Sequence, residues 1–242
     1  MRHNFFRNRE SLINSIILFL GIILVLLGII FLKSTVISTV LISVGSSLIA
    51  SSVVSFITTY NMMIRIKQNE ITEKWGLECI TENRGLMNAI INDCFKKKVS
   101  QIDIIAYGLK SFRESKDSTI RNQLIKGMSM RIITVKPDSP ILNQKDDDEN
   151  KMPGSTESTI IDLVTWVGEI NETMNANIRL KCIDKLPTEL YFRVDDMVFV
   201  GPYELLRESQ QTVTYQYRCN TLGGNYYQQY FEQLWEISKE IE

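Results

Sequence analysis

Histidine is almost missing from this chain of 242 residues, because the single one, His3, lies at the very start. The long C-terminal part therefore lacks the residue that Ser-His-Asp, Cys-His and histidine-nucleophile mechanisms need. Four cysteines are present but form no Cys-x-x-Cys pair, which argues against a zinc site. We expect small buried thiols in a reducing compartment, no metal and no cofactor. The cysteines are Cys79, Cys94, Cys182 and Cys219.

An excess of basic charge is also lacking. The chain has 27 Lys and Arg against 28 Asp and Glu, and from residue 61 onward the balance is 23 basic to 27 acidic. Any contact with nucleic acid must therefore be a local patch. The composition, 44% apolar and 23% charged, is not that of a disordered chain, and the length allows a membrane segment plus one domain.

The N-terminal region contains a long uncharged stretch, "LINSIILFLGIILVLLGIIFL", over residues 12–32. Its 21 residues match the length of a helix that crosses a membrane. Only "KST" separates it from a second apolar segment, about 36–60, whereas a signal peptide would have a shorter apolar core and a cleavage site. We predict a transmembrane helical hairpin over residues 1–60.

Basic residues flank this hairpin at both ends, whereas its turn contains only Lys33. The positive-inside rule then places both termini in the cytoplasm, with two membrane spans and a cytosolic C-terminal domain. The flanking residues are Arg2, Arg7 and Arg9 before the first span and Arg65 and Lys67 after the second.

Hydroxyl residues recur at every fourth position of the second span and form a slowly winding stripe on a helix. Small residues of this kind let helices pack closely or bond back to their own backbone. Alternatively, several copies of the span line a polar path in an oligomer, as in a poorly selective pore. The stripe consists of Thr39, Ser43, Ser47, Ser51, Ser55 and Thr59.

The cytosolic part begins with an amphipathic pattern that predicts a connector helix over 61–98. Residues 99–242 then predict an α/β domain with a parallel strand-helix-strand unit at its start. The stretch "NQKDDDENKMPGS" is predicted to be a solvated loop, since it lacks the spacing of a calcium site. The predicted strands are "QIDIIAYGL", "MRIITVKPDSP", "NIRLKCID", "ELYFRVDD", "MVFVGPY" and "QTVTYQYRC", and the predicted helices are "STIRNQLIKGM", "STIIDLVTWVGEINETM" and "YYQQYFEQLWEISKEI".

The order of these elements, with "ELYFRVDDMVFVGPY" before a polar strand and a helix containing "FEQLWE", resembles one half of the phospholipase D superfamily fold over residues 100–237. That resemblance implies a mixed-sheet α/β domain with a cleft for phosphate groups, and pairing of single halves into dimers. The family signature His-x-Lys-x4-Asp is absent, so no catalytic residue is carried over and no enzyme activity is expected. If Asp195 is aligned with the family aspartate, Thr188 and Leu190 stand at the histidine and lysine positions. If Asp196 is aligned instead, Glu189 and Tyr191 stand there.

A phosphodiesterase scaffold without its nucleophile implies a module that binds a nucleotide or oligonucleotide. The candidate ligand-binding residues are expected on loops and strand ends around the cleft. Taken singly, the basic ones are equally consistent with solvated side chains or, for Arg193, with a surface ion pair. The candidates are Lys110, Ser111, Arg113, Arg193, Gln210, Thr212 and Thr214, and Gly223 and Gly224 offer either free amides or a simple turn.

Two membrane spans joined to a nucleotide-sensing domain resemble the layout of bacterial anti-phage effectors, in particular the channel-forming effector of the Hailong system. The layout implies an effector of the bacterial inner membrane whose ligand gates permeabilisation of that membrane. It is expected to act as a homo-oligomer, a dimer or a tetramer, in contact with membrane lipid. It also implies a signal-synthesising nucleotidyltransferase as a partner. Two other functions remain open, a membrane-anchored phosphodiesterase or phospholipase-like enzyme and a membrane-anchored scaffold without catalysis.

Overall fold

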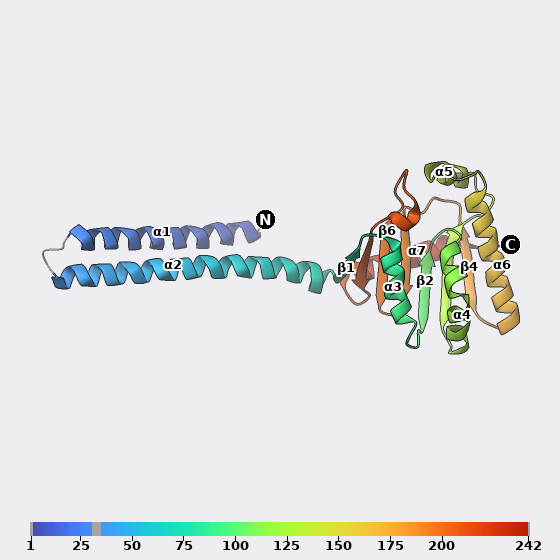
Figure 1. Cartoon of the computed structure of the whole chain (residues 1–242), viewed down its shortest axis with the longest axis horizontal. Helices are drawn as coiled ribbons and strands as arrows, with labels where there is room; N and C mark the ends of the chain where they lie inside the picture. Colours follow the sequence, from blue (N-terminus) through green and yellow to red (C-terminus); the bar gives the residue numbers. More distant parts are fainter. Residues whose placement is uncertain (1, 31–34, 242) are drawn as a thin grey trace. The chain divides into compact units, whose positions relative to one another are not determined.

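The computed structural model describes residues 2–30 and 35–241, and side chains over 11–30 and 36–241. The predicted turn with Lys33, the last two residues of the first span and the side chains of His3, Arg2, Arg7 and Arg9 lie outside what is described. The chain divides into two compact units, 1–69 and 70–242. The prediction of two N-terminal apolar helices followed by a mixed-sheet α/β domain is confirmed (Figure 1).

The first unit is a pair of helices, α1 (Arg2–Ile30) and α2 (Thr35–Asn69). Segments Ser11–Ile30 and Val36–Lys74 are long and apolar enough to cross a membrane, with mean hydropathies of 2.9 and 2.1. Their apolar side chains are largely exposed, Phe19 to 66% and Val36 to 74%. The core helix of a water-soluble protein would bury such side chains, so these faces are suited to lipid or to further copies of the chain.

Small residues let the two helices of the hairpin approach closely. Gly21 faces Gly45, and Ser38 donates a hydrogen bond of 2.8 Å to the Gly28 carbonyl. At a further point Asn14 Nδ2 donates to Ser55 Oγ at 2.8 Å. In a membrane, lipid tails are as apolar as the helix side chains, so the hydrophobic effect does not drive helices together. Helices there usually pair through close backbone approach and hydrogen bonds between them.

The hydroxyl stripe is divided by this packing. Ser55 and Thr59 are half-buried, whereas Thr39, Ser43, Ser47 and Ser51 are exposed on the single hairpin. Ser47 donates to the Ser43 carbonyl four residues earlier at 2.9 Å. One end of the stripe is thus packed within the helix pair, and the role of the stripe in a pore or in packing between copies stays a prediction.

The second unit is built on a sheet that, within the described residues, has eight strands in the order β1-β7-β6-β5-β2-β3-β4-β8. Strands β2, β3 and β4 are parallel and the other pairs are antiparallel. The strands are β1 (Leu77–Thr81), β2 (Gln101–Ile105), β3 (Ser129–Val135), β4 (Ile178–Ile183), β5 (Glu189–Val194), β6 (Met197–Pro202), β7 (Thr214–Arg218) and β8 (Lys239–Glu240).

Helices cover both faces of this sheet (Figure 1). One face carries α3, α4 and α6 over a core that includes Ile102, Ile104 and Leu163, and the other carries α7, whose Phe231 packs on Tyr191 of the sheet. Burial on both faces explains the near-continuous apolar sequence of the central strands. The helices are α3 (Arg84–Cys94), α4 (Lys110–Ile125), α5 (Ile141–Asp148), α6 (Ser155–Met174) and α7 (Leu222–Ile237), with a π-helical turn η1 (Glu70–Lys74) and a 3-10 turn η2 (Ser209–Gln211).

The prediction of one connector helix over 61–98 is wrong. After η1 the chain turns at Gly76, whose φ of 74° is left-handed, and continues as strand β1 beside β7. Thr221 Oγ1 donates to the Trp75 carbonyl at 2.9 Å, and the Arg218 amide donates to the Gly76 carbonyl at 3.0 Å. These long-range bonds outweigh the local helical pattern, and α3 starts only after the side chain of Asn83 caps it.

The acidic stretch "NQKDDDENKMPGS" is likewise not a solvated loop, because residues 141–148 form α5. Leu142, Lys145 and Asp146 are buried there. Asp146 Oδ1 accepts hydrogen bonds from the amide of Thr156, at 2.9 Å, and from its hydroxyl, at 2.5 Å. The segment is therefore packed on the start of α6, which sequence periodicity over eight residues did not reveal.

A candidate anion-binding cleft

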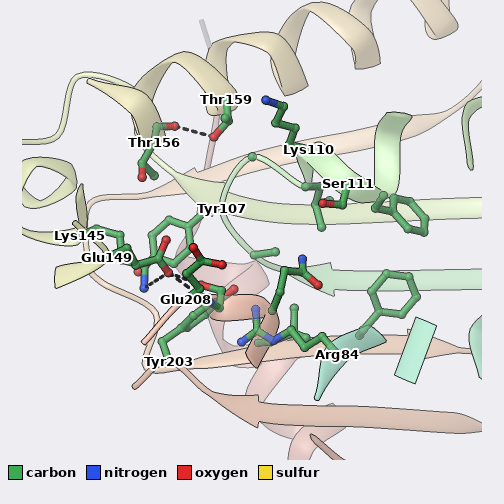
Figure 2. A pocket seen from close by; sticks show the side chains of 18 of the residues that line it. Arg84, Tyr107, Lys110, Ser111, Lys145, Glu149, Thr156, Thr159, Tyr203 and Glu208 are labelled. Carbon is green, nitrogen blue, oxygen red and sulfur yellow. Dashed lines mark hydrogen bonds and ion pairs between the residues drawn. The ribbon is translucent and has the colours of Figure 1, made fainter. Parts of the chain in front are cut away.

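A cleft of about 310 Å³ opens beyond the carboxyl end of β2 (Figure 2). This is the edge at which α/β sheets usually bind ligands. Side chains from α3, α4, α5, α6, β5 and the segment around η2 converge on it. The polar and aromatic lining residues are Arg84, Asn88, Tyr107, Lys110, Ser111, Phe112, Lys145, Glu149, Lys151, Thr156, Thr159, Phe192, Tyr203, Glu208, Ser209 and Gln210.

The N-terminus of α4 forms one wall. Gly108 lies so close to Thr159 that a β-carbon would clash, and Leu109 has a left-handed φ of 51°. This tight turn brings Lys110 and Ser111 to the cleft. Within the described part of the chain no side chain caps this helix, so its first amides and the positive end of its dipole are open to an anion.

A second group of hydrogen-bond donors surrounds the carboxylate of Glu149. Lys145 Nζ lies 2.8 Å from Oε1, the Ser209 amide donates to the same oxygen at 3.2 Å, and Lys151 Nζ pairs with Oε2. The Ser209 hydroxyl also donates to Oε1. Burial alone raises the pKa of Glu149, but the bonds from Lys145, Lys151 and Ser209 outweigh it and hold the pKa at about 2. The carboxylate is therefore ionised throughout the neutral range.

Aromatic rings and a buried arginine complete the cleft. The rings of Tyr107 and Tyr203 meet edge to face at 4.9 Å, and Lys145 Nζ lies 4.9 Å from the Tyr203 ring centre. Arg84, only 5% exposed, stacks over Tyr203 at 4.6 Å, and its Nε has no hydrogen-bond partner among the described residues. Burial raises the pKa of Tyr107 and of Tyr203, which keeps both phenols neutral. The cleft combines flat apolar surfaces with cations, which suits a base and its phosphates.

The predicted ligand-binding residues divide into two groups. Lys110, Ser111 and Gln210 line the cleft, although Lys110 and Ser111 belong to the first turn of α4 and not to a loop, and Gln210 belongs to η2 and not to a strand. Arg113 lies behind the wall, where its side chain donates to the carbonyls of Gly108, at 3.0 Å, and Thr159, at 3.4 Å. It holds the tight turn in place and does not reach into the cleft.

Arg193, Thr212 and Thr214 do not line the cleft. Arg193 donates to the Asp195 carbonyl at 2.8 Å and pairs with the fully buried Asp103 at 3.4 Å, on the sheet face that α7 covers. Thr212 and Thr214 are buried, and Thr212 donates to the Ser209 carbonyl. The predicted surface ion pair of Arg193 with Asp195 or Asp196 is wrong, because the half-buried Arg193 pairs instead with Asp103, which is aligned with it on β2.

The positions that the phospholipase D resemblance assigned to catalysis separate as well. Leu190 lines the cleft, whereas Tyr191 lies on the opposite face and stacks on Phe231. Glycines Gly223 and Gly224 are buried in the first turn of α7, where the side chain of Thr221 caps the helix. Within the described residues, no group of His, Cys, Asp and Glu is placed to hold a metal ion.

Lys145, Glu149, Lys151, Arg84 and Tyr203 were missed by the sequence analysis. One signal was present, since Lys145 and Glu149 are four residues apart, the spacing of a helical ion pair. The reach of this segment to the cleft depends on its packing against α6 and η2, which no local pattern encodes.

No family model matches the sequence, and no curated protein is similar to it at a significant level. The structure is similar to TrmBL2, described as an archaeal chromatin protein with a novel mode of DNA binding, with 11% identity and a TM-score of 0.45 over 81% of this chain and 70% of that one. It is also similar to Nuc of Salmonella typhimurium, a phospholipase D family member, with 10% identity and a TM-score of 0.40 over 64% of this chain and 90% of that one. Likeness at these TM-scores does not establish a shared function.

Proposed function

We propose that the cytosolic domain binds a nucleotide or oligonucleotide in the cleft, and that this binding controls permeabilisation of the bacterial inner membrane by oligomers of the hairpin, in anti-phage defence. The observation that carries the proposal is the convergence of Arg84, Lys110, Lys145 and Lys151 with the open end of α4 in one cleft. Phosphate oxygens are bound in proteins by such ammonium, guanidinium and helix-end donors.

The membrane half of the proposal is supported by the composition of the hairpin. Its two spans are apolar and mostly exposed in the single chain, and the hydroxyls of Thr39, Ser43, Ser47 and Ser51 are exposed on α2. Assembly of several copies would cover the apolar faces and bring these hydroxyls to a shared path. The basic residues that flank the hairpin support an orientation with both termini in the cytoplasm.

Binding without turnover is part of the proposal. When Asp195 is aligned with the family aspartate, Leu190 takes the position of the family lysine, and Leu190 lines the cleft. Leucine can neither donate a proton nor stabilise a phosphoryl group. A signal of this kind requires a separate synthesising enzyme, which we propose to be a nucleotidyltransferase.

Native mass spectrometry of the full chain, purified in detergent from its host, tests the ligand. We expect a copurified phosphate-bearing species that is retained by Lys126→Ala and lost from Lys110→Ala. Lys126 is a matched control, because it follows the far end of the same helix and is exposed. A species retained equally by both variants would place the ligand elsewhere on the protein.

A further inference from the structure

The carboxylate of Glu149 is bound as an anionic ligand would be. Its side chain is 2% exposed, and two ammonium groups, one hydroxyl and one backbone amide converge on its two oxygens. This mixture of donors around a single oxyanion is typical of phosphate sites. The cluster lines the same cleft as the open end of α4 and the unpartnered Nε of Arg84.

We infer that Glu149 is an internal competitor, and that a phosphate group of the ligand takes its place between Lys145, Lys151 and Ser209. This inference rests on the proposed function and adds to it a second phosphate subsite and a built-in threshold for binding. The ligand class follows from the donors: a nucleotide bearing a terminal phosphate or a pyrophosphate, whose charge exceeds that of one carboxylate.

The exchange has a mechanical consequence within the domain. Glu149 follows α5 directly, and its bonds to Ser209 tie that segment to η2. A ligand that expels the carboxylate replaces this direct tie with one through its phosphate, which bridges Lys145 and Lys151 to Ser209. The Glu149 side chain is thereby freed from η2 only when the subsite is filled.

Calorimetry of the full chain in detergent with inorganic pyrophosphate tests the exchange. Since Glu149→Gln removes the competing charge, we expect its affinity to be about tenfold higher than that of the parent chain. Glu208→Gln is the matched control, because Glu208 lines the same cleft, is exposed and makes no bond to either lysine among the described contacts. Its affinity should rise no more than about twofold, because the loss of the Glu208 charge removes only a weak, screened long-range repulsion.

Equal gains in the two variants, or no gain in either, overturn the inference. If Glu149→Gln fails to fold, Lys151→Met decides, because Lys151 is 46% exposed and Lys145 still pairs with Glu149 in its absence. That variant should bind pyrophosphate about fivefold more weakly, and unchanged affinity rejects the subsite.

Adenosine, which has no phosphate, should bind the parent and Glu149→Gln equally. If calorimetry shows no exchange at Glu149, the proposed control of the hairpin by nucleotides is not affected. If the exchange occurs but membrane leakage does not respond to nucleotides, the proposed function is rejected and the exchange stands.

Discussion

Gly45 on α2 lies against Gly21 on α1, so closely that a β-carbon on Gly45 would stand 2.7 Å from the Gly21 carbonyl oxygen. Backbone at this separation leaves no room for a side chain. The hairpin is therefore a specific helix pair, and Ser43, Ser47 and Ser51 of the hydroxyl stripe are exposed on its surface.

Gly45→Leu should separate the two helices, at a cost of about 1 to 3 kcal/mol, because the leucine cannot fit against Gly21. Cysteines introduced at Asn14 and Ser55, whose side chains are hydrogen-bonded in the parent, should crosslink there and not in the Gly45→Leu background. Val44→Leu, at an exposed neighbouring position, is the control and should crosslink as the parent does. Efficient crosslinking in both backgrounds would show that this contact does not organise the hairpin.

The depressed pKa of Glu149 predicts an acid-labile contribution to stability. Its pKa is about 2 in the folded state against an ordinary 4.5, so the stabilisation is complete above pH 4.5 and is lost as the pH falls toward 2. Between these values the free energy of unfolding of the parent should fall more steeply than that of Glu149→Gln. Urea unfolding at a series of pH values measures the difference, and parallel curves would mean that Glu149 is not held by its three partners.

Lys110→Ala should weaken nucleotide binding about 10- to 150-fold, since a charge-assisted bond to phosphate contributes roughly 1.5 to 3 kcal/mol. Arg113→Ala should instead lower the midpoint of thermal unfolding, because Arg113 holds the Gly108 turn and does not line the cleft. Fluorescence anisotropy with a labelled nucleotide and a thermal melt of each variant separate the two effects. A nucleotide affinity that depends on Arg113 more than on Lys110 would reverse this assignment.

The purified chain should not hydrolyse phosphodiesters. Neither register of the family signature provides a histidine or a lysine, and Leu190 lies in the cleft. Incubation with bis-(p-nitrophenyl) phosphate and with DNA should give no product above a buffer blank. Turnover that is abolished by a change at Thr188 or Glu189 would establish an enzyme instead.

The sequence predicts the central strands of the domain because they are buried on both faces and therefore have a strong apolar pattern, as in Ile102 and Ile104. It fails at β1, where Ile80 and its neighbours fit a helical pattern but pair with β7, more than a hundred residues away. The same limit applies to the site. Lys110 and Ser111 were predictable from the end of a strand, whereas Arg193 was misplaced because its partner, Asp103, is 90 residues distant in the chain.

Leakage from proteoliposomes tests the central claim most directly. Vesicles that contain the parent chain and an entrapped dye are mixed with a short single-stranded oligodeoxynucleotide or with ATP. We expect one of these ligands to change the rate of dye release about tenfold, and we expect Lys110→Ala to shift the response to correspondingly higher ligand concentrations. Ser47→Leu with Ser51→Leu should block release while leaving the protein inserted and assembled, since leucine closes a narrow polar path. Release that is independent of both ligands, and equally fast in the double leucine variant, would contradict the account.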